Sequence, residues 1–83
     1  MFYVYILLSD KTGHFYIGST GNLQDRLNRH FNGRSKATMN GRPWKLVWTQ
    51  EFDSRKEAVN REMEIKSWKS HQLIVQLLQR IPI

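Results

Sequence analysis

The chain has 83 residues, and a domain of this size buries only about 60% of its unfolded surface, so we predict one domain over residues 1–83 with a shallow site. Thirteen lysines and arginines against seven aspartates and glutamates give a formal charge of +6, which favours a nucleic acid partner, although such charge can also serve solubility alone. The absence of cysteine excludes disulfides, thiolate zinc sites and a cysteine nucleophile, and it fits a reducing cytoplasm.

The first predicted element is a β-hairpin formed by residues 2–8 and 14–19, which are rich in aromatic and β-branched types around turn-forming residues 10–13. If Tyr5 pairs with Gly18, the alternation separates two faces. The first face is apolar and is expected to be the core: Phe2, Val4, Ile6, Leu8, Phe15 and Ile17. The second is expected to carry hydroxyls: Tyr3, Tyr5, Leu7, His14 and Tyr16. Residues 2–8 are too short to span a bilayer and lack a basic leader, so we expect no membrane association.

A helix is predicted next, from the recurrence of Leu23, Leu27 and Phe31 at every fourth position. Residues 20–22 (Thr-Gly-Asn) can cap its start, and Asn-Gly at 32–33 can stop it. Arg26 and His30 lie about 60° from the apolar stripe, at the lip where the helix meets the sheet.

Residues 32–43 are small, polar and basic without periodicity, which predicts a loop. Candidate phosphate contacts there are Arg34, Lys36, Thr38 and Arg42, and Lys66 is a further candidate outside the loop. The alternative is that these are ordinary surface residues. After the loop, alternation over residues 44–52 predicts a third strand.

Ser54 and Glu57 form a capping box that opens a second helix, extending to about Lys69. Ser70 can cap a third helix with a single apolar stripe: Leu73, Ile74, Leu77, Leu78 and Ile81. The predicted fold is therefore α+β, a three-stranded antiparallel sheet flanked by three helices in the order ββαβαα.

Glu62 is unusually placed for a carboxylate, because on the second helix it falls between Ala58 and Val59 and should be half buried. A half-buried carboxylate needs a partner or a metal ion. The simpler interpretation is a salt bridge to Lys66 one turn away, reinforced by Lys69. The helix pattern alone favours the salt bridge.

Four residues together indicate a more specific chemistry: Tyr16, Arg26, His30 and Glu62. In hydrolysis of a phosphodiester, a hydroxyl or imidazole takes the proton of the attacking water, a guanidinium steadies the phosphate, and a carboxylate holds Mg²⁺. Each has an ordinary alternative: tyrosine suits strands, and a histidine near a helix end can interact with the helix dipole. No HExxH pattern is present, which disfavours a histidine zinc site.

The sequence resembles the GIY-YIG nuclease domain, especially the small stand-alone bacterial members and the excision-repair nuclease domain. Residues 3–5 (Tyr-Val-Tyr) stand where the family's first triplet falls, and residues 16–18 (Tyr-Ile-Gly) are its second triplet. Arg26, His30 and the segment 58–66 around Glu62 complete the pattern. Tyr3 replaces the glycine of the first triplet, and Ser19 stands where the excision-repair domain has lysine.

This resemblance implies the GIY-YIG endonuclease fold and a role for each matched residue. Tyr16 would be the general base or its close partner, with Tyr5 hydrogen-bonded in support. Arg26 would bind the scissile phosphate and His30 would assist proton transfer. Glu62 would be the single protein ligand of one Mg²⁺ or Mn²⁺ ion, and Gly18 would let a phosphate approach the backbone closely.

The leading hypothesis is a cytoplasmic, metal-dependent endonuclease that cuts DNA, structure-directed or non-specific, in repair or recombination, with nicked, flapped or branched DNA as candidate substrates and no small-molecule cofactor. One alternative is a nucleic-acid-binding module that is catalytically weak or inactive. A third hypothesis is a protein-interaction adaptor with a contact patch made of Trp44, Trp48 and Trp68.

Overall fold

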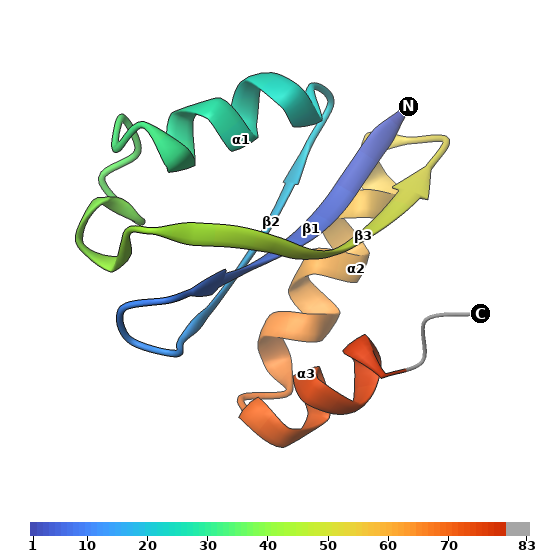
Figure 1. Cartoon of the computed structure of the whole chain (residues 1–83). Helices are drawn as coiled ribbons and strands as arrows, with labels where there is room; N and C mark the ends of the chain where they lie inside the picture. The colour runs from blue at the N-terminus through green and yellow to red at the C-terminus, as the bar shows by residue number, and fades with distance from the viewer. Residues whose placement is uncertain (80–83) are drawn as a thin grey trace.

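The structure is a computed structural model and describes residues 1–79. Its elements follow the predicted order: β1 (Phe2–Ser9), β2 (Phe15–Thr20), α1 (Leu23–Phe31), the short 3₁₀ helix η1 (Met39–Gly41), β3 (Trp44–Phe52), α2 (Arg55–Ser67) and α3 (His71–Leu78). Figure 1 shows the path of the chain. The α+β prediction is confirmed, η1 was not foreseen, and Ile81 of the predicted third stripe lies outside the described residues. Within residues 1–79, no helix has the length and apolarity needed to cross a membrane.

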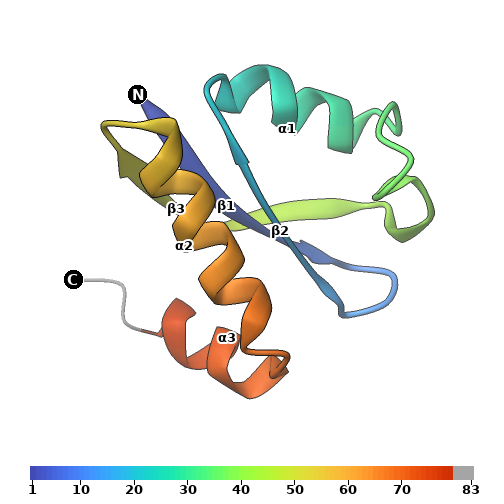
Figure 2. The same cartoon turned by 180° about the vertical axis from the view of Figure 1, so that it is seen from behind.

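The sheet is antiparallel throughout, in the order β2-β1-β3, so β1 is its central strand. Tyr5 pairs with Gly18, the register that was assumed in assigning the two faces of the hairpin. Between β1 and β3 the register shifts: Ile6 faces Trp48 while Leu7 faces Leu46, so one residue of β3 bulges. In Figures 1 and 2 α1 lies on one side of the sheet, and α2 and α3 lie on the other.

Each face of the sheet has its own core, because residues 4–7 of the central strand are fully buried. On the side of α2 and α3 the core consists of Val4, Ile6, Ile17, Ala58, Ile65, Ile74 and Leu77. On the side of α1 it consists of Tyr5, Leu7 and Leu27, with Tyr16, Leu23 and Trp44 packed against them. The predicted core face is confirmed by Val4, Ile6 and Ile17, but the face that was expected to carry hydroxyls is also a core, because α1 packs its apolar stripe against Tyr5 and Leu7.

The helix boundaries follow from side-chain caps. Asn22 accepts a hydrogen bond from the backbone N–H of Asp25, and Ser54 accepts one from that of Glu57, as predicted. The second helix ends at Ser67, before the predicted Lys69, whose positive φ of 48° takes the chain out of the helix. Ser70 then caps α3.

The three tryptophans do not form one surface. Trp44 packs on the α1 side of the sheet, whereas Trp48 and Trp68 pack on the α2 side. There the Arg61 guanidinium lies over both rings, 5.9 Å from the centroid of Trp48 and 5.8 Å from that of Trp68. The contact patch predicted for an adaptor protein is therefore wrong, because the sheet separates its members.

Candidate functional site

The phenol of Tyr5 lies at the centre of the candidate site. Its side chain is fully buried, and the space beside the backbone of Gly18 on β2 is filled by its ring and hydroxyl, so that a Cβ at position 18 would overlap them. Gly18 is therefore required here for close packing of Tyr5. The predicted approach of a phosphate to Gly18 is wrong, since Tyr5 occupies that space and Gly18 is buried.

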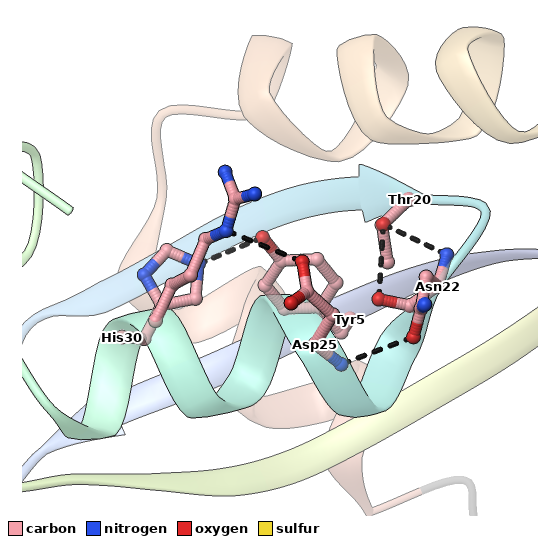
Figure 3. A network of polar contacts seen from close by, with 6 residues as sticks. Tyr5, Thr20, Asn22, Asp25 and His30 are labelled. Atoms are coloured by element: carbon pink, nitrogen blue, oxygen red, sulfur yellow. Dashed lines mark hydrogen bonds and ion pairs between the residues drawn. The ribbon is translucent and has the colours of Figure 1, made fainter. Parts of the chain in front are cut away.

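His30 reaches Tyr5 from α1, and Figure 3 shows the two side chains pointing toward one another. The Tyr5 hydroxyl lies 2.9 Å from Nε2 of His30, and the Thr38 hydroxyl lies 2.8 Å from Nδ1. His30 is only 1% exposed, which places it beneath the surface instead of at the predicted lip. Both ring nitrogens are therefore occupied by protein hydroxyls.

Thr38 belongs to this buried network and is not exposed to solvent. It is fully buried, its hydroxyl bonds to His30, and its backbone carbonyl accepts a 2.6 Å hydrogen bond from Nε1 of Trp44. The predicted phosphate contact at Thr38 is therefore wrong. Its position instead ties the loop of residues 32–43 to α1 and to the start of β3.

Burial, followed by the nearby charge of Arg26, lowers the pKa of His30 from its ordinary value of 6.5. The imidazole is thus neutral at neutral pH. A cationic role at the end of α1, the alternative weighed from the sequence, does not fit this environment.

We expect the free energy of unfolding to fall as pH drops below 6.5, the ordinary pKa that His30 regains on unfolding. Below this pH His30 is protonated in the unfolded chain but stays neutral in the folded chain. The free energy of unfolding therefore decreases by up to about 1.4 kcal/mol per pH unit. Urea unfolding of the wild type and His30→Gln between pH 7.5 and 5.5 measures this slope. An equal slope in both proteins would contradict the assignment.

The electrostatics of Tyr5 connect the remaining predicted residues. Burial, then the neighbouring Tyr16 and to a lesser extent the charge of Glu62, raise its pKa to about 12 against the opposing effect of Arg26. Tyr5 therefore stays a neutral phenol. The ring of Tyr16 lies 6.4 Å from that of Tyr5 and 4.9 Å from that of His30, centroid to centroid. Tyr16, His30 and Arg26 thus surround the phenol, and Glu62 is near enough to act on it through its charge.

Glu62 of α2 is held by two donors. Its side chain is 17% exposed, and it accepts 2.5 Å hydrogen bonds from the Ser19 hydroxyl and from Nζ of Lys66. The predicted salt bridge to Lys66 is confirmed, but within residues 1–79 no ion pair joins Lys69 to this carboxylate. Sequence reasoning missed Ser19 as a partner, although its place next to Gly18 puts it on the α2 face by simple alternation.

A cleft of about 330 Å³ opens beside these residues, between the first turns of α1 and α2 and the end of β2. Arg26 lies on one wall and Ser19 on another. Arg55, which sequence reasoning missed, contributes a second guanidinium and lies 5.7 Å from the centroid of the Phe2 ring. Two arginines against the single acidic lining residue Asp25, together with two helix starts, leave the cleft with an excess of positive charge.

The predicted basic loop residues are all on the surface. Arg34, Lys36 and Arg42 are exposed. Arg42 also folds back on its own loop, where its guanidinium packs against Gly33 and its Nε donates to the carbonyl of Met39 at 3.3 Å. These three side chains can meet a phosphate backbone without rearranging the core.

The donor set fits a magnesium-type site better than a closed protein cage. In the part of the chain that the structure describes, no three histidine, aspartate or glutamate side chains are grouped for metal binding. Mg²⁺ typically keeps several waters and binds through one or two carboxylates plus substrate phosphates. Glu62 is such a carboxylate, partly exposed, and its lysine partner is itself 51% exposed and free to move aside.

Comparison with known proteins identifies the family. Residues 1–74 match the family described as the GIY-YIG catalytic domain. A UPF0213 protein of Staphylococcus haemolyticus is 37% identical over 79 residues, covering 94% of this chain and 95% of that protein. A UPF0213 protein of Clostridium perfringens is 43% identical over 67 residues, covering 80% of this chain and 71% of that protein.

A solved structure is also similar. The solution NMR structure of a UPF0213 protein from Bacillus halodurans superposes with a TM-score of 0.60 at 37% identity, covering 95% of this chain and 84% of that one. The family match spans β1, β2, α1 and α2, the elements that carry the five side chains predicted to act together. The chain therefore belongs to the GIY-YIG family.

Proposed function

We propose that this protein is a divalent-metal-dependent endonuclease that hydrolyses phosphodiester bonds in DNA. Membership of the GIY-YIG family supports a nuclease-type function with nucleic acid as substrate. The observation that carries the proposal is that Tyr16, Arg26 and His30 surround the Tyr5 phenol, and that Glu62 is bonded to Ser19, which lines the cleft with two arginines.

The geometry suggests a different role for each side chain. Tyr16 is half exposed, so its hydroxyl can contact the attacking water, and Arg26 can bind the phosphate from the cleft wall. Tyr5, with its pKa of about 12, stays protonated and acts as a hydrogen-bond partner. His30 is buried and acts through Tyr5 as a positioning residue, because its two nitrogens fix the phenol and the loop.

A Mg²⁺ or Mn²⁺ ion would be held by Glu62, with water and the substrate phosphate completing its coordination. When bound, it would supply charge neutralisation at the leaving oxygen. Until then Ser19 and Lys66 hold the carboxylate in place.

The test is cleavage of nicked, flapped and branched DNA with Mg²⁺, with Mn²⁺ and with a chelator. We expect cutting only with metal, and Arg26→Ala should reduce the rate by about 10²-fold or more, because a positioned donor to the reacting phosphate is lost. The matched control is Arg29→Ala on the same helix. Arg29 is exposed and bonds to Asp25 at 3.2 Å, so its loss should leave the rate within about twofold.

Equal losses of cleavage rate in Arg26→Ala and Arg29→Ala would contradict the proposed site.

A binding module without catalysis remains the second candidate, because both carboxylate oxygens of Glu62 are already satisfied by Ser19 and Lys66. That function predicts salt-sensitive DNA binding with no metal-dependent product on any substrate.

A further inference from the structure

Another cavity, of about 310 Å³, lies at the other end of β2 and shares only Tyr16 with the site described above. We call it the aromatic cavity after Tyr16, Trp44 and His14, with the exposed Thr12 and Asn40 on its rim. Phe15, whose ring packs on the α2 side of the sheet, Ala37 and Gly41 complete the lining. None of its lining residues is acidic. The cavity is therefore suited to a flat, polarisable group carried by an anionic molecule.

The wall formed by Trp44 is rigid. Its Nε1 donates a 2.6 Å hydrogen bond to the Thr38 carbonyl, and its ring packs so closely on Gly41 that a Cβ there would overlap it. The Tyr16 ring stands edge-on to it, with centroids 6.3 Å apart and planes at 66°. A ligand ring that enters the cavity thus meets aromatic surfaces whose orientation is already fixed.

The aromatic cavity and the arginine cleft lie on one line along β2. Tyr16 lines the cavity, and Ser19 and Thr20 line the cleft. Four residues of strand span about 13 Å. Arg26 lines the cleft and Tyr16 lines the cavity, so each hollow contains one residue of the proposed site.

We propose that the aromatic cavity binds one unpaired nucleobase of the strand that is cut, next to the phosphate bound by Arg26. The proposal rests on the proposed nuclease function. The cavity volume of about 310 Å³ is ample for one base, the aromatic walls can stack on it, and Asn40 and Thr12 can reach its polar edge. A base paired and stacked inside a duplex cannot enter, so the substrate class is DNA with an unpaired nucleotide at the cut.

The test uses the Glu62→Gln protein, so that substrate is not consumed, and measures binding of a single-stranded ten-nucleotide DNA by fluorescence anisotropy. One abasic nucleotide is moved through every position in turn. We expect one position at which the abasic substitution weakens binding about 10-fold, the loss of one stacked base, while other positions change by less than about twofold. A blunt duplex of the same length should bind more weakly than the single strand.

Two protein variants locate the effect. Asn40→Ala on the exposed rim should weaken binding of the intact strand, and the loss should disappear with the strand that is abasic at the sensitive position. Trp48→Phe, on the opposite side of the sheet, is the control. It should change neither the binding of the intact strand nor the binding of the abasic strand. Circular dichroism confirms that both variants are folded.

Uniform effects of the abasic nucleotide at all positions, or duplex binding as tight as single-strand binding, would overturn the proposal. This failure is distinct from failure of the nuclease function. If wild-type protein cleaves with metal but shows no sensitive position, the cavity assignment alone is wrong. If a sensitive position exists and no substrate is ever cut, the cavity assignment stands and the nuclease function fails.

Discussion

Replacing Glu62 by glutamine should lower metal-dependent cleavage by about 10³-fold or more and leave the protein folded. The amide has almost the same shape and can still accept the hydrogen bond from Ser19, but it has no charge to attract a divalent cation. Loss of a metal ligand removes several kcal/mol of charge stabilisation from the transition state, and each 1.4 kcal/mol is about tenfold in rate. Single-turnover cleavage across a Mg²⁺ titration measures the effect.

Glu64→Gln is the matched control for this change. Glu64 lies two residues further along α2, its side chain is 56% exposed, and it bonds at 2.7 Å to Arg61. Its replacement should leave the rate and the Mg²⁺ dependence within about twofold, because an exposed ion pair contributes little. Similar losses in both variants, or full activity in Glu62→Gln, would show that α2 does not supply the metal ligand.

The order and the bounds of most elements were predictable because local patterns determine them. Period-two alternation located β3 at residues 44–52, and the caps at Asn22, Ser54 and Ser70 located the starts of the three helices. The pairing of Tyr5 with Gly18, which was assumed for the hairpin, is the register observed. The end of α2 was missed by two residues, because a positive φ at Lys69 has no strong signal in a lysine.

Contacts between distant elements were not predictable in the same way. Thr38 carries no pattern that distinguishes it from a solvent-exposed loop residue, yet it bonds to His30, eight positions earlier and on another element. Ser19 and Glu62 are 43 positions apart and meet only because α2 crosses the edge strand β2. Burial of the tyrosine face likewise depends on where α1 docks, which no single segment specifies.

The candidate site illustrates both cases. Tyr5, Tyr16, Arg26, His30 and Glu62 were identified from residue type, spacing and family resemblance, and the fold brings them to one place. How deeply each of these side chains is buried was not predicted. The burial of Tyr5 and His30 changes how they can act, since buried side chains position their neighbours instead of touching a polymer substrate.

Replacing Gly18 by alanine should destabilise the protein by about 1–3 kcal/mol, the usual effect of an added methyl group in a packed core. Its backbone φ is not positive, so the loss comes from the overlap of the new Cβ with the Tyr5 phenol. The ring must move, and with it the 2.9 Å contact to His30, so cleavage should fall as well. Urea unfolding gives the free energy, and the cleavage assay gives the rate.

Gly21→Ala provides the matched control, since it adds the same methyl group three residues later. The nearest atom to a Cβ there is a Phe2 ring carbon at 3.2 Å, and that half-exposed ring can yield. Both changes restrict the unfolded chain equally, so their difference isolates the contact with Tyr5. In a Tyr5→Leu background the loss from Gly18→Ala should shrink to less than half, because the phenol that it displaces is gone. Equal effects of Gly18→Ala and Gly21→Ala in the wild type would mean that Tyr5 does not pack over Gly18, and the centre of the proposed site would have to lie elsewhere.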